Sequence, residues 1–113
     1  MYKKISTIRN DKMKSQSGLC YYCKQPMWRD GIKQFVQKFG LSLKQAAMFK
    51  CTAEHLTARC DDGSNSKANL VAACFYCNKT RHFSKKPLSP NEYLKKVRKR
   101  LKAGRWHMQP LLK

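Results

Sequence analysis

Residues 69–82 have the sequence NLVAACFYCNKTRH, in which a short apolar run leads into two cysteines separated by two residues. A second cysteine pair with the same spacing lies in the stretch GLCYYCKQP at 18–26. Two such pairs, far apart in the chain, are typical of a structural zinc ion held by four thiolates. An ion of this kind would stabilise a chain too short for a large core. The predicted zinc ligands are Cys20, Cys23, Cys74 and Cys77.

The segments around these cysteines predict an α+β fold. Residues 48–56 look extended, 57–68 are rich in turn residues, 69–73 form a second short strand, and a helix begins near Cys74. Apolar residues at helical spacing predict helices over 31–39 and 42–48, the second capped by Ser42. Another helix is predicted over 89–103, with a capping residue at its start and a glycine just past its end. We expect a basic segment at 1–17, a core at 18–86 with a helical insert at about 28–47, and a basic helix and tail at 87–113.

The charge of the chain predicts a polyanionic partner. Its formal net charge is +19, from 25 lysines and arginines against 6 acidic residues. Nucleic acid is the partner that such a balance favours, because neutralising phosphates releases counterions. No apolar run is long enough to anchor the chain in a membrane, and 42% apolar content argues against disorder.

The N-terminus lacks the apolar stretch of a signal peptide, so we expect a reducing, cytoplasmic location. In that compartment, closely spaced cysteines favour metal over disulfides. Cys51 and Cys60 fall outside the two pairs. We interpret them as buried small residues, although a role as ligands stays open.

Four polar residues lie between and beside the cysteine pairs: Glu54, His55, Asn69 and Asn78. Phosphodiester hydrolysis needs a base for water and a cation at the phosphate. A neutral imidazole can be the base, and carboxylate and amide oxygens suit a divalent cation. A regular strand would place Glu54 and His55 on opposite faces, so we expect a bend or bulge after Glu54. Taken singly, each of these residues has a plain structural explanation as a cap, a surface charge or a packed histidine.

The ordered set of motifs resembles the HNH, or ββα-metal, endonuclease family. The matching residues are the two cysteine pairs, the Glu54-His55-Leu56 tripeptide, Asn69 and Asn78, with the gaps that this family shows. The resemblance implies a two-stranded antiparallel hairpin followed by a helix, with flanking helices and a zinc staple. It also implies DNA as the substrate, products with 5′-phosphate and 3′-hydroxyl ends, and one site per chain. Double-strand breaks would therefore need a homodimer or two separate events.

The resemblance assigns a role to each of these residues. His55 would be the general base, and Asn69 would orient its ring through the side chain or the backbone carbonyl. Glu54 and Asn78 would bind the catalytic cation, Mg²⁺ or Mn²⁺. Glu54 is longer than the aspartate that is usual there. His82 lies one helical turn beyond Asn78 and is a candidate third ligand or phosphate contact, with a plain surface histidine as the alternative.

Basic residues near this site and along the C-terminal helix are candidates for binding nucleic acid. We expect the tryptophans to pack rather than to stack on bases. Two other functions fit part of the sequence: a zinc-bound nucleic-acid binding module without catalysis, and a nuclease that acts on RNA. The candidate nucleic-acid contacts are Lys79, Arg81, Lys85, Lys86, Lys95, Lys96, Arg98, Lys99, Arg100 and Lys102.

Overall fold

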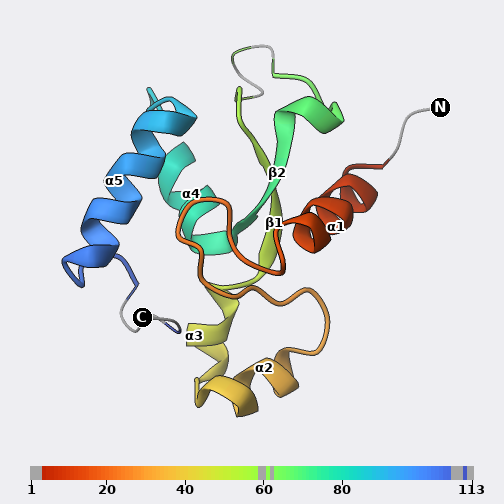
Figure 1. Ribbon diagram of the computed structural model, residues 1–113, viewed down its shortest axis with the longest axis vertical. Coiled ribbons are helices and arrows are strands. Elements are labelled where there is room, and N and C mark those ends of the chain that lie inside the picture. The colour runs from red at the N-terminus through yellow and green to blue at the C-terminus, as the bar shows by residue number, and fades with distance from the viewer. Residues whose placement is uncertain (1–3, 59–60, 62, 108–110, 112–113) are drawn as a thin grey trace.

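An antiparallel hairpin of two five-residue strands, β1 (Cys51–His55) and β2 (Leu70–Cys74), lies at the centre of the molecule (Figure 1). The computed structural model describes residues 4–58, 61, 63–107 and 111. The strands pair without interruption, from Cys51 opposite Cys74 to His55 opposite Leu70. Every residue of β2 is buried, as expected for a short apolar strand that other elements cover.

Helices lie on both sides of this hairpin (Figure 1). α1 (Ile5–Ser15) contacts both strands on one side, and α4 (Phe75–Phe83) contacts both strands on the other. α5 (Pro90–Lys102) lies outside α4 and turns its apolar stripe toward the core. The Tyr93 hydroxyl on α5 donates a hydrogen bond of 2.7 Å to the carbonyl of Cys77, which ties the two helices together.

The helical insert forms a lobe at one end of the hairpin, made of α2 (Ile32–Phe39) and α3 (Leu43–Ala47) (Figure 1). Ser42 caps α3 in a reciprocal capping box with Gln45. Trp28 packs against this lobe, and its indole N–H donates to a carbonyl of α3. The lobe has an apolar cluster of its own, whose buried members are Phe35, Leu41, Ala46 and Phe49.

The loop that carries the first cysteine pair is attached to the outer edge of β2. Tyr21 N–H donates to the Ala72 carbonyl at 3.0 Å. The Gln16 side chain, just past α1, bonds both the carbonyl and the N–H of Ala72. These contacts satisfy backbone groups that a two-stranded sheet would otherwise leave unpaired at its edge. A short 3-10 turn, η2 (Lys67–Asn69), leads into β2.

The structure confirms the α+β prediction with its hairpin, flanking helices and cysteine cluster. The predicted insert helices and the C-terminal helix form close to the expected bounds, and Ser89 caps α5 as expected. None of the helices in the described part of the chain is long and apolar enough to span a membrane.

The cysteine loop holds one non-glycine residue in a left-handed conformation. Lys24 has a φ of 58° and closes the turn by donating its N–H to the Cys20 carbonyl. A side chain in this region costs about 1–2 kcal/mol, and glycine avoids most of that cost. We expect Lys24→Gly to raise the free energy of unfolding by about 0.5–1 kcal/mol in urea titrations. Lys24→Ala is the matched control, because it removes the charge but keeps the strain. Equal stability of the two variants would contradict this explanation.

Candidate metal centres and nuclease site

The four predicted ligand cysteines come together in a buried cluster. Their sulfur atoms all lie within 4.8 Å of one another. One pair comes from the loop at 18–26. The other comes from the junction of β2 and α4, where Cys74 ends the strand and also caps the helix. Backbone N–H groups point at the sulfurs, including Cys74 N–H to Cys20 Sγ at 3.3 Å and Cys77 N–H to Cys74 Sγ at 3.4 Å.

The donor set of this cluster fits a metal ion such as zinc. Hydrogen bonds from Cys20, Cys74 and Cys77 hold the pKa of the Cys23 thiol well below its ordinary value. Hydrogen bonds with Cys20 and Cys23 raise the pKa of the Cys74 thiol, and burial raises that of Cys77, so Cys23 is the member of the cluster held as the metal-binding thiolate. Cys51 is buried outside the cluster, and burial raises the pKa of its thiol to about 11. Cys60 lies outside the described residues.

Two residues that follow α5 close over the cluster, and no motif predicted this contact. The Trp106 indole N–H donates to Cys77 Sγ at 3.2 Å, and His107 Nε2 lies 3.3 Å from Cys23 Sγ. Both side chains are buried. Trp106 thus packs in the core, as predicted for the tryptophans, and also donates a hydrogen bond to a sulfur.

A buried carboxylate lies on the α4 side of the hairpin. Glu54 has no exposed surface. Its Oε2 accepts from the Tyr22 hydroxyl at 3.0 Å and from Arg81 Nη1 at 3.2 Å, while its Oε1 lies 2.6 Å from His82 Nε2. A buried charge is tolerated only with partners of this kind. Burial, and next the nearby Glu54 carboxylate, raise the pKa of Tyr22, which therefore stays a hydrogen-bond donor.

Arg81 was predicted to contact phosphates, and the structure shows that this is wrong. Its side chain is buried and forms an ion pair with Glu54. Three of the other guanidinium N–H groups donate to the carbonyls of His55, Leu56 and Leu88. The planar fork of arginine suits this combined task, because it bonds one carboxylate and several carbonyls at once.

Asn78 lies one turn before His82 on the same face of α4. Its amide nitrogen donates to Thr52 Oγ1 at 3.0 Å and to the Ala53 carbonyl at 3.1 Å. A backbone carbonyl only accepts, so this contact fixes which end of the amide faces the strand. The Asn78 Oδ1 is the end that receives no hydrogen bond from the described residues, and it stays available as a ligand oxygen.

Glu54 and His82 therefore meet between β1 and α4, and Asn78 contacts β1 one turn earlier on the same face of α4. The side chain of His82 is 29% exposed, so solvent reaches the site from its side. Two ligand atoms on one cation lie about 3 Å apart, given bonds of about 2.0–2.2 Å. The Glu54–His82 contact of 2.6 Å would need to open by only a few tenths of an ångström. The residues thus fit a divalent cation in place of the shared proton.

His55 lies on the opposite face of β1 from Glu54. The expected bend or bulge after Glu54 is absent, because Glu54 pairs with Val71 and His55 with Leu70 in regular register. Side chains alternate along such a strand. The His55 ring instead contacts the loop between the strands, where its Nε2 lies 2.7 Å from Asn65 Oδ1. If Nε2 donates to this oxygen, Nδ1 is the basic nitrogen of the neutral ring.

Asn69 was predicted to orient His55, and none of its contacts in the described part of the chain reaches that ring. Its amide instead closes the base of the loop: the nitrogen donates to the carbonyls of Thr57 and Ser64, and Oδ1 accepts from the Thr57 N–H. Its backbone carbonyl accepts from Leu56. Asn69 therefore shapes the loop that presents Asn65, the residue that does contact the imidazole.

The other candidate nucleic-acid contacts lie on the surface. All six basic residues of α5 are exposed, as are Lys79, Lys85 and Lys86. No ion pair joins any of them to an acid among the residues that the structure describes. Their charge is therefore free to meet an external anion.

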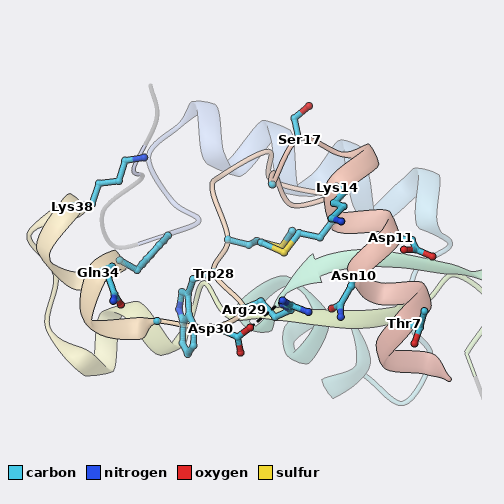
Figure 2. Close-up of a pocket in the computed structure, with 15 residues that line it drawn as sticks. Thr7, Asn10, Asp11, Lys14, Ser17, Trp28, Arg29, Asp30, Gln34 and Lys38 are labelled. Carbon is cyan, nitrogen blue, oxygen red and sulfur yellow. Dashed lines mark ion pairs between the residues drawn. The ribbon is translucent and has the colours of Figure 1, made fainter.

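An open groove of about 850 Å³ lies between α1 and α2 (Figure 2). Its rim carries charges of both signs, and Arg29 and Asp30 form an ion pair there at 3.1 Å. None of the predicted site residues lines this groove. It is therefore separate from the cluster around Glu54.

We expect substitution of a cluster cysteine to abolish metal retention. Cys23→Ser should lose the bound ion and most of the folded structure, because structural zinc contributes on the order of 10 kcal/mol to small domains. The measurement is metal content by mass spectrometry together with near-ultraviolet circular dichroism. Cys51→Ala is the matched control, since this thiol is buried but lies outside the cluster. Full metal retention by Cys23→Ser would refute the assignment.

We also expect Glu54→Gln to destabilise the fold by about 3 kcal/mol, because it leaves the Arg81 charge buried without its counter-charge. Replacing both residues, as Glu54→Gln with Arg81→Met, should recover part of that loss in urea titrations at saturating zinc. Additive effects of the two single substitutions would show that the pair is not coupled.

The comparisons with known proteins agree with the motif analysis. Residues 43–84 match the family described as HNH endonuclease. No curated protein and no solved structure shows a significant match to the chain. The matched segment contains both strands and all of α4, while the first cysteine pair lies outside it. The predicted resemblance to the HNH family is thus confirmed over residues 43–84, the part of the chain that holds Glu54, His55, Asn69, Asn78 and His82.

Proposed function

We propose that this protein is a metal-dependent endonuclease that hydrolyses phosphodiester bonds in DNA. The observation that carries the proposal is the Glu54–His82 contact between β1 and α4, with Asn78 against β1 one turn earlier, inside the segment that matches the HNH family. The excess of positive charge supports a nucleic-acid substrate. The preference for DNA rests on the family resemblance.

In this proposal, Glu54 Oε1, Asn78 Oδ1 and His82 Nε2 hold the cation. A bound Mg²⁺ or Mn²⁺ would neutralise charge on the phosphate and on the leaving oxygen. Thr52 and the Ala53 carbonyl orient the Asn78 amide, and Arg81 and Tyr22 hold Glu54 by its other oxygen. The ligands are therefore positioned in advance, which lowers the cost of binding the ion.

His55 is the proposed general base. Its Nδ1 would accept a proton from the attacking water, while Asn65 holds Nε2. Because His55 and Glu54 lie on opposite faces of β1, the phosphate must lie across the end of that strand. Water attack and the departing oxygen would then be on opposite sides of the phosphorus, which is the geometry of an in-line displacement.

A zinc-bound nucleic-acid binding module without catalysis is the second candidate. The observation in its favour is the complete burial of Glu54 among Tyr22, Arg81 and His82. This network also makes sense as a purely structural element. A nuclease acting on RNA is a further alternative, because the same phosphate chemistry serves both nucleic acids.

The decisive measurement is cleavage of supercoiled plasmid and of matched single-stranded DNA and RNA in Mg²⁺ or Mn²⁺. We expect the wild-type protein to cut DNA, and His55→Ala to lose about 10²–10⁴-fold in rate, the usual contribution of a general base. Asn65→Ala keeps the His55 imidazole and removes only the contact that orients it. Its cleavage rate should therefore lie between those of the wild type and His55→Ala. No cleavage by the wild type in either metal would favour the binding module, and cleavage of RNA alone would favour the RNA nuclease.

We expect His82→Ala to weaken metal binding and to leave the function of His55 as the general base unchanged. Loss of a ligand should raise the Mg²⁺ concentration for half-maximal cleavage by at least about 10-fold, with part of the rate recovered at high metal. His55→Ala should leave that midpoint unchanged in the same titration. Identical midpoints for wild type and His82→Ala would remove His82 from the proposed ligand set.

A further inference from the structure

α4 carries a second stripe of side chains beside the proposed metal ligands. Phe75, Lys79 and Phe83 follow one another at intervals of four residues, so they lie along one line of the helix. Each of Lys79 and Phe83 directly follows a proposed ligand, Asn78 or His82. Adjacent helical residues differ by 1.5 Å along the axis and about 100° around it. The two stripes therefore run side by side toward the end of α4.

The last residue of this stripe is unusually exposed. Phe83 has 86% of its surface accessible, more than any other large apolar residue in the described part of the chain. At the other end of the stripe, Phe75 is half-buried and the Lys79 ammonium lies 5.7 Å from its ring centroid. A single exposed apolar residue is common on protein surfaces, so its surroundings must carry the argument.

Those surroundings are cationic. From 79 to 88 the chain has three exposed lysines and no acidic residue, while its one arginine, Arg81, is buried against Glu54. A cationic setting disfavours burial of the ring in the apolar interface of another protein, and it favours a strand of nucleic acid. Aromatic side chains among basic residues bind such strands by stacking on their bases.

We propose that Phe83 stacks on a nucleobase next to the phosphate that is cut, while Lys79 contacts the backbone on the same strand. The inference rests on the proposed nuclease function and adds the form of its substrate. A ring stacks most readily on a base that is already unpaired or easily unstacked. The preferred substrate is therefore DNA with single-stranded character at the cleavage point, read without regard to base identity.

The test measures binding apart from cleavage. The zinc-loaded chain of residues 1–113 would be titrated against a fluorescent single-stranded oligonucleotide with no added Mg²⁺ or Mn²⁺, at several KCl concentrations. We expect Phe83→Ala to raise the Kd by about 5- to 150-fold, the usual range for loss of one stacked base. The slope of log Kd against log KCl should stay that of the wild type, because phenylalanine carries no charge. Lys79→Ala should instead reduce that slope by about 0.7.

Two further variants separate stacking from other effects. Phe83→Trp should keep the affinity, whereas Phe83→Leu should lose it, because leucine is apolar but has no aromatic face. Leu43→Ala is the matched control, since Leu43 is 62% exposed on α3, in the helical lobe away from the end of α4 (Figure 1). Its Kd should equal that of the wild type.

Each outcome bears on a different statement. A Kd for Phe83→Ala within twofold of the wild type, or full affinity in Phe83→Leu, would overturn the stacking proposal even if plasmid cleavage is observed. Weakened binding in Phe83→Ala without cleavage by the wild type in any metal would overturn the nuclease proposal and leave the stacking contact in place. Equal loss on single-stranded and fully paired oligonucleotides would overturn the stated substrate preference.

Discussion

The convergence of four sulfur atoms is the constraint on which the rest of this small structure depends. It joins the loop at 18–26 to the point where β2 becomes α4. Because Cys74 is both the last residue of the strand and the cap of the helix, an ion bound there fixes the angle between the two. That angle sets how Asn78 and His82 face β1. The four-cysteine cluster thus positions the residues of the proposed nuclease site.

The environment of Glu54 shows how an anion is kept in the interior of a strongly basic chain. Full desolvation of a carboxylate is unfavourable, and here Arg81 and Tyr22 compensate for it at one oxygen. The second oxygen faces His82, and in the proposed site a cation would take the place of the proton between these two groups. The same guanidinium also holds the carbonyls of His55 and Leu56. Arg81 therefore both neutralises the Glu54 carboxylate and holds the backbone that follows β1.

Local signals in the sequence predicted the elements well, because they are read within a few residues. The caps at Ser42 and Ser89 and the spacing of the cysteines all act over short distances, and all are found in the structure. The hydrogen-bond partner of each side chain in the site could not be predicted in this way. Whether Arg81 faces solvent or a carboxylate depends on where α4 meets β1, which is a tertiary property.

The position of His55 could have been predicted from the sequence. Strand alternation alone places it opposite Glu54, and the bulge was invoked only to bring both residues to one face. The structure keeps the alternation and supplies Asn65 from the loop instead. One asparagine in a turn-rich segment could not be singled out, since asparagine is common in turns for reasons unrelated to catalysis.

The contacts of Trp106 and His107 with two of the sulfurs connect the metal centre to the far end of the chain. These residues follow α5 after a short turn, and the outer face of α5 holds six exposed basic side chains. Loss of the ion would let these sulfurs take up protons, which would weaken the hydrogen bonds from Trp106 and His107 and loosen the helix before them. In the proposed function, metal occupancy would then affect nucleic-acid binding through this helix as well as folding.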